Sequence, residues 1–155
     1  LVVAASGDAA EALRVLRNTQ VDRVVGQRLA GSRPVLVVGA AMDALFERAA
    51  DGAAGFGEWP GGVVKLDAPV ERAAVAAADG SQMLDGAQEF VFNAATGARD
   101  FELKEDEFIA YPKLSWAGEV LAAVENGPLW ATRFHPETSG EAGAGVLRNW
   151  IAQLG

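Results

Sequence analysis

The sequence predicts an α/β fold built on a parallel sheet, and three features of its first 50 residues lead to that prediction. A short apolar run at residues 1–4 ends at turn residues and is followed by two segments with helical spacing. A continuous apolar run at residues 35–38, in which three of the four residues are β-branched valines, is typical of a strand buried on both faces. A sharp turn then leads directly into a third segment with helical spacing, which completes a strand–turn–helix unit.

The expected elements of this part are, in order, a strand at 1–4, helices at 9–18 and 21–29, a strand at 35–38 and a helix at 42–50. The first helix carries Leu13 and Leu16 on one face. The second has apolar residues at i, i+3, i+4 and i+8 and ends at Gly31.

The middle of the chain predicts antiparallel structure. Its glycine-rich stretch at residues 52–62 indicates a loop, and the alanines at 73–78 indicate either a loose helical turn or a loop. The remaining expected elements are short strands at 63–66, 89–92, 101–103 and 108–111, a hairpin of 120–125 and 129–133, and a helix at 141–154.

Composition narrows the class of protein. The 155 residues are 50% hydrophobic, which predicts a single domain over residues 1–155 with a buried core. A net charge of -8 argues against nucleic-acid binding. With one histidine and no cysteine, disulfides are excluded and neither a metal site nor a cofactor is expected. No membrane span or signal peptide is visible, so we expect a cytoplasmic protein.

The motif that suggests a function lies near the C-terminus. Residues 130–143 read W-A-T-R-F-H-P-E-T-S-G-E-A-G and contain the only histidine, His135, two residues before Glu137. This run, with segments 42–47, 57–61, 99–103, 123–132 and 147–150, resembles the glutaminase subunit of imidazole glycerol phosphate synthase. That subunit is a class I glutamine amidotransferase. The resemblance implies its flavodoxin-like fold, in which a parallel sheet carries an antiparallel strand insertion.

The resemblance also implies a catalytic triad of cysteine, histidine and glutamate. His135 and Glu137 match its last two members. The cysteine, which the family presents on a sharp strand-to-helix turn, is replaced by Gly39. The flanking glycines of that turn are Val37 and Ala41 here, which crowd the approach of a substrate to the backbone.

Other parts implied for the site have changed as well. Of the family's oxyanion loop, which matches residues 4–7, only Gly7 remains, and Ala40 follows the position of the lost nucleophile. Residues 93–97 replace a histidine–serine–tyrosine stretch, and Arg133 and Thr138 replace a glutamine and a lysine. These changes put glutamine binding in doubt.

The sequence therefore predicts a pseudo-glutaminase that docks on the (β/α)₈ cyclase subunit, as half of a heterodimer. One alternative is an active glutaminase with a substitute nucleophile, for which Ser6, close to Asp8, is the candidate. Another is a relic or fragment without a task. The alternative expectations without a catalytic role are that His135 has a structural role, that residues 6–8 form a turn and that residues 104–107 form a solvated turn. Trp130 and Trp150 are expected in the core.

The N-terminus raises one more expectation. Members of the family begin with a strand and a helix that would precede Leu1, and the first strand of a doubly wound sheet usually lies centrally. Loss of that strand would leave sheet edges unpaired. We therefore expect either a chain truncated at its N-terminus relative to the family or a rearrangement of its early segments.

Overall fold

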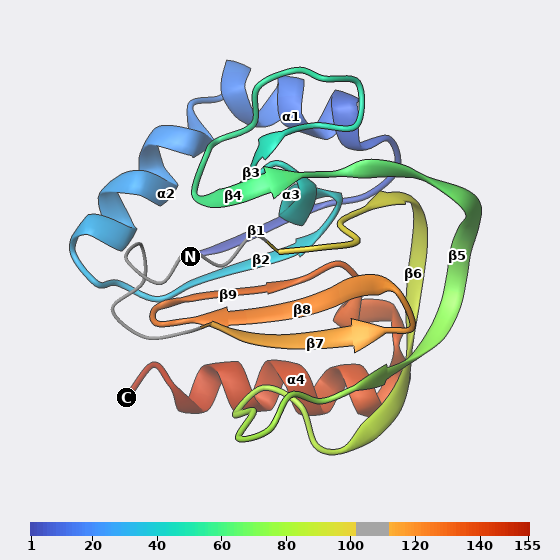
Figure 1. Cartoon of the computed structure of the whole chain (residues 1–155). Coiled ribbons are helices and arrows are strands. Elements are labelled where there is room, and N and C mark those ends of the chain that lie inside the picture. Colours follow the sequence, from blue (N-terminus) through green and yellow to red (C-terminus); the bar gives the residue numbers. More distant parts are fainter. Residues whose placement is uncertain (102–111) are drawn as a thin grey trace.

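The computed structural model describes residues 1–101 and 112–155, which form a seven-stranded sheet with helices on both faces (Figure 1). Its strands are, in spatial order, β1 (Val2–Ala5), β2 (Val35–Gly39), β9 (Leu129–Thr132), β8 (Val120–Asn126), β7 (Lys113–Ala117), β5 (Val64–Ala76) and β6 (Ala87–Gly97). A separate parallel pair consists of β3 (Phe46–Arg48) and β4 (Trp59–Gly62).

The helices divide between the two faces of the sheet. On one face lie α1 (Ala9–Asn18), α2 (Val21–Ala30) and the short α3 (Ala40–Asp43), and on the other lies α4 (Gly140–Ala152) (Figure 1). Strand β2 is buried along its whole length because its side chains alternate between two cores. Val35 and Val37 join the core beneath α1 and α2, whereas Leu36 and Val38 pack with Trp150 of α4.

The parallel part of the sheet consists of β1, β2 and β9, in which Ala5 lies opposite Gly39 and Val38 opposite Thr132. A hairpin turn at Gly127 and Pro128 joins β9 to the antiparallel β8. The predicted α/β fold with an antiparallel insertion is therefore confirmed. Helices α1, α2 and α4, strand β2 and the hairpin also lie where the sequence predicts them, to within a few residues at their ends.

The prediction of a helix at residues 42–50 is wrong. Helix α3 ends at Asp43, and the chain is extended from Phe46 as β3. Phe46 is fully buried with its ring centroid 5.3 Å from that of Trp59 in an edge-to-face contact. The backbone of β3 finds its hydrogen bonds in residues 55–59 rather than one helical turn away; the N–H of Gly55, for example, donates to the carbonyl of Glu47. Contacts with a distant segment thus outweigh the helical spacing.

Three further expectations differ from the structure. The alanines at 73–78 belong largely to β5, because Ala73 and Ala74 pair with Phe90 and Glu89 of β6. The expected loop at 52–62 ends in strand β4, and β7 was not expected. Residue 101 is not in a strand, and the rest of the strands expected at 101–103 and 108–111 lies outside the described residues, as does the turn at 104–107.

Strand β1 forms one edge of the sheet. The expectation that a strand and a helix of the family are missing before it stays a prediction. Among the described residues, no helix has the length and apolar character needed to cross a membrane.

Candidate functional site

Gly39 ends strand β2 and lies at a sharp turn into α3. Its backbone has φ 70° and ψ -136°, a region that side-chain-bearing residues rarely adopt. The sharp strand-to-helix turn implied by the resemblance is therefore present. The next residue, Ala40, is fully buried as the first residue of α3.

His135 follows β9, at the same end of the sheet. Its ring Nδ1 lies 2.8 Å from Oε1 of Glu137, which comes from the 3₁₀ turn η1 (Pro136–Thr138). A carboxylate only accepts hydrogen bonds, so this contact assigns Nδ1 as the protonated donor and leaves Nε2 as the other edge of the ring. The imidazole is buried, whereas the Glu137 side chain is half exposed.

The backbone of His135 is fixed to strand β6. Its N–H donates to the carbonyl oxygen of Val91 at 2.7 Å. Ser139 completes a second link, because its Oγ donates to the His135 carbonyl at 2.6 Å and accepts from the Val91 N–H at 2.9 Å. Ser139 was not predicted from the sequence. It lies at the start of α4, a position where a hydroxyl often satisfies free backbone groups.

The ring of His135 also occupies the space beside Gly39. A Cβ added at Gly39 would lie 2.4 Å from Cε1 and 2.9 Å from Nε2 of His135, and 2.3 Å from the carbonyl oxygen of Ala5. These separations are far shorter than a van der Waals contact between such atoms. A side chain at position 39 therefore requires the histidine ring and the neighbouring strand β1 to move.

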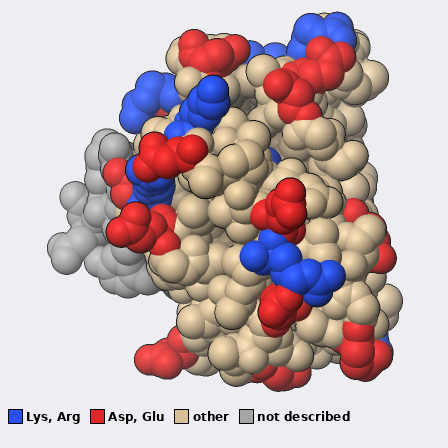
Figure 2. Space-filling model, turned by 90° about the vertical axis from the view of Figure 1, so that its right-hand side faces the viewer, with Lys and Arg blue, Asp and Glu red and all other residues tan. Residues whose placement is uncertain are grey.

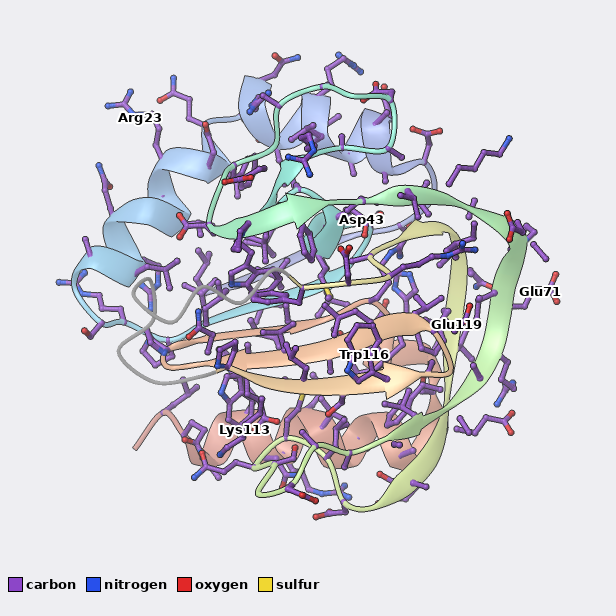
Figure 3. The ribbon with its side chains drawn as sticks, in the orientation of Figure 1. Arg23, Asp43, Glu71, Lys113, Trp116 and Glu119 are labelled. Atoms are coloured by element: carbon purple, nitrogen blue, oxygen red, sulfur yellow. The ribbon has the colours of Figure 1, made fainter. Side chains whose placement is uncertain are left out.

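A buried ion pair lies close to this turn. Asp43, the last residue of α3, has Oδ1 3.2 Å from Nε of Arg133, and its Oδ2 accepts a hydrogen bond of 2.5 Å from Thr96 Oγ1. Arg133 Nε also donates to the Thr96 carbonyl at 3.2 Å. Asp43, labelled in Figure 3, is almost fully buried, and burial raises the pKa of its carboxyl although Arg133 and Thr96 act in the opposite direction.

Sequence reasoning identified Arg133 only as a replacement for a glutamine and did not identify Asp43. The signal that could have found the pair is a charged residue in each of two otherwise apolar segments, since such residues are rarely buried unless paired.

The other predicted site residues follow strand β1. Ser6 and Gly7 are exposed, and Gly7 has φ 79° at the bend after β1. Asp8 caps α1, because its carboxylate accepts a 2.9 Å hydrogen bond from the N–H of Glu11. Within residues 1–101 and 112–155, His135 makes no hydrogen bond to Ser6, and its Nε2 makes none at all.

Comparison with known proteins identifies the family to which the chain belongs. The chain is 44% identical to the imidazole glycerol phosphate synthase subunit HisH of Nocardia farcinica, over 99% of this chain and 79% of that protein. It is 42% identical to the same subunit of Thermobifida fusca, over 99% and 80%. The chain belongs to the HisH family. No model of a protein family matches it.

Solved structures agree with the fold expected of a HisH family member. One glutamine amidotransferase superposes with a TM-score of 0.70 at 20% identity, covering 99% of this chain and 77% of that one. A glutamine amidotransferase from Thermotoga maritima gives a TM-score of 0.58 at 14% identity, over 98% and 61%. At these identities the likeness shows the fold alone, which is the class I glutamine amidotransferase fold predicted from the sequence.

Proposed function

We propose that this chain is a HisH-type subunit of imidazole glycerol phosphate synthase, in histidine biosynthesis, that retains the glutaminase fold without glutamine hydrolysis. The observation that carries the proposal is the turn at Gly39. It has the conformation of a nucleophile-bearing turn, but the space for a side chain is filled by His135 and by the carbonyl of Ala5.

The chemistry needs a nucleophile that His135 can deprotonate. The sequence contains no cysteine, and Gly39 has no side chain. The retained pair of His135 and Glu137 is then a general base with no nucleophile to deprotonate. Removing the nucleophile of a coupled catalytic unit lowers turnover on the order of 10⁶-fold. We therefore assign the pair a structural role at the junction of β9, β6 and α4.

The proposal includes docking on the (β/α)₈ cyclase subunit. We place the docking surface at the end of the molecule toward which β1 and β2 run, where His135 and Glu137 also lie, since a glutaminase and its acceptor must face each other for ammonia to pass. Figure 2 shows this end, on which clusters of acidic and basic side chains are separated by uncharged areas. Such a surface suits a protein partner better than an anionic polymer.

Docking is tested by titrating the chain with the cyclase subunit from the same source in a calorimeter. We expect saturable one-to-one binding tighter than about 10 μM, equivalent to about 7 kcal/mol. Glu71 lies at the proposed docking end and Arg23 at the opposite one (Figure 3). Glu71→Arg should therefore weaken binding while Arg23→Glu leaves it unchanged. A folded sample that gives no heat would contradict docking.

The loss of chemistry is tested by ammonia release from glutamine, with the cyclase present. We expect none above background for the natural chain. Gly39→Cys should not restore the activity, because the new Cβ would meet the Ala5 carbonyl at 2.3 Å. Substantial activity of Gly39→Cys would show that the rest of the site is intact. Release by the natural chain that disappears in His135→Ala would instead reveal a substitute nucleophile.

A further inference from the structure

A pocket of about 260 Å³ opens at the end of the sheet opposite to His135. Strands β2 and β9 are parallel and both begin at this end, whereas Gly39 and His135 follow their other ends (Figure 1). The pocket lies between the segment before β2, the turn between β8 and β9, and the end of α4. The side chains that line it include Ser32, Pro34, Pro128, Trp130, Trp150 and Gln153.

Two tryptophans of the pocket have an indole N–H without a partner. Trp130 and Trp150 are only 4% and 8% exposed, and they pack in the core on the α4 face. Within residues 1–101 and 112–155 neither Nε1 makes a hydrogen bond, yet neither is sealed from solvent as Nε1 of Trp59 is. Buried tryptophans usually find a partner for this group, which can only donate. Since both rings line the pocket, the pocket offers two unused donors.

The rest of the lining is neutral and has few free acceptors. None of the residues that line the pocket is charged. The Pro34 carbonyl accepts a hydrogen bond of 3.2 Å from Arg28, and the Pro128 carbonyl accepts one of 2.9 Å from the N–H of Val35. The two proline rings and the two indole rings form apolar walls. A matching ligand is therefore an apolar ring with hydrogen-bond acceptors, without a charge and without a donor of its own.

We propose that this pocket binds a proline-rich peptide segment in the polyproline II conformation. A peptide bond before proline has a carbonyl acceptor but no N–H, which matches tryptophans that only donate. Its pyrrolidine ring packs against the ring-lined walls, and the preformed polyproline II helix loses little entropy on binding. At about 30 Å³ per water-sized group the pocket holds roughly nine such groups, about one proline residue. The neighbouring peptide residues lie outside it, towards the exposed Leu154.

The test uses the nitrogen-15-labelled chain alone and three capped peptides of equal length. Hexaproline is the probe. A serine–glycine peptide has an N–H at every residue, and hexasarcosine has tertiary amides without a ring. We expect hexaproline to saturate with a Kd of about 1 mM and to shift the indole N–H signals of Trp130 and Trp150 but not that of Trp59. The other two peptides should bind at least about tenfold more weakly.

Variants locate the binding site. Trp150→Phe keeps an aromatic ring but removes one donor, and should weaken hexaproline binding several-fold. Gln153→Glu leaves the core intact and places a carboxylate at the rim, where it repels peptide carbonyl oxygens, so it should also weaken binding several-fold. Gln82→Glu is the matched control, because this exposed residue does not line the pocket and the change in charge is the same. It should leave the Kd unchanged.

Four outcomes would overturn the inference. The serine–glycine peptide or hexasarcosine could bind as tightly as hexaproline. Hexaproline could saturate without moving the signals of Trp130 and Trp150, which would place it elsewhere. Saturation could be absent up to about 10 mM, tenfold above the expected Kd. Because the pocket lies at the end opposite to the proposed cyclase surface, failure of either proposal leaves the other intact.

Discussion

At Gly39, both the backbone conformation and the packing disfavour a side chain. A residue with a side chain would be strained at φ 70°, and its Cβ would also collide with the backbone of β1 and the ring of His135. Gly127, in the hairpin between β8 and β9, has a similar φ of 57° but no atom within 4 Å of an added Cβ. Substitution at Gly127 therefore tests a positive φ alone, whereas substitution at Gly39 tests a positive φ together with a collision.

We expect Gly39→Ala to lower the free energy of unfolding by about 3 kcal/mol or more, and Gly127→Ala by about 1 kcal/mol, the cost of the left-handed conformation alone. Urea denaturation of both variants beside the natural chain measures the difference. Equal losses would mean that the ring of His135 and strand β1 yield easily, and would weaken the case against a side chain at position 39.

Asp43 should make stability depend on pH. Because burial raises its pKa, the folded protein holds this proton more tightly than the unfolded chain. The stability that the group contributes is present at acidic pH and is lost as pH rises through the raised pKa. The unfolding free energy of the natural chain minus that of Asp43→Asn, which does not titrate there, should therefore fall from pH 4 upward. A difference that stays constant or rises across the series would contradict this assignment.

At the scale of elements, the 3₁₀ turn η1 is joined to strand β6 through Ser139. The hydroxyl connects two backbone groups, the Val91 N–H and the His135 carbonyl, and both lose a partner if it is removed. The hydroxyl of Thr138 beside it makes only a long 3.4 Å contact to the same carbonyl, which also accepts from the Thr138 N–H at 3.2 Å. The link determines how the segment after β9 approaches the sheet, and so where the histidine ring lies.

Ser139→Ala should lower the free energy of unfolding by about 1–3 kcal/mol, because it leaves the Val91 N–H unsatisfied and removes the shorter of the hydrogen bonds to the His135 carbonyl. Thr138→Ala, the control, should cost less than about 0.5 kcal/mol. Nitrogen-15 shifts of the His135 ring report whether the Nδ1 tautomer persists, and we expect a mixture of tautomers in Ser139→Ala. An unchanged ring spectrum would show that Glu137 alone orients the histidine.

At the scale of the whole molecule, one sheet separates two cores and contributes side chains to both. Trp59 lies in the core beneath α1 and α2, whereas Trp130 and Trp150 lie in the core on the α4 face. Neither core can lose its packing without disturbing β2, whose alternate residues belong to each. The two cores should therefore unfold together.

Thermal unfolding followed by far-ultraviolet circular dichroism and by tryptophan fluorescence should give one coincident transition. A double variant, Trp130→Phe with Trp150→Phe, removes the tryptophans of the α4 core and leaves Trp59 and Trp116, which both pack in the other one, as reporters. Its transition should still coincide with the loss of secondary structure. Separate transitions, or none, would favour the alternative that the chain is a relic without a stable fold.

The local sequence pattern correctly predicted the helices and strands that long-range packing also favours. The valine-rich run at 35–38 and the spacing of Leu13 and Leu16 each indicate an element that the structure contains. Phe46 and the alanines at 73–78 were misread because their partners, Trp59 and Phe90, are distant in the sequence. Of the site, the motif identified His135, Glu137 and Gly39, but neither Asp43 nor Ser139.

The fold class, the family and the absence of a cysteine follow from the amino-acid sequence alone, because they depend on residue identity and on periodicity along the chain. That the ring of His135 fills the space beside Gly39, and that Asp43 and Arg133 are paired inside the protein, is visible only in the folded molecule. Each of these contacts joins segments about 90 residues apart. Their distances follow from the register of β1, β2 and β9, which no local pattern contains.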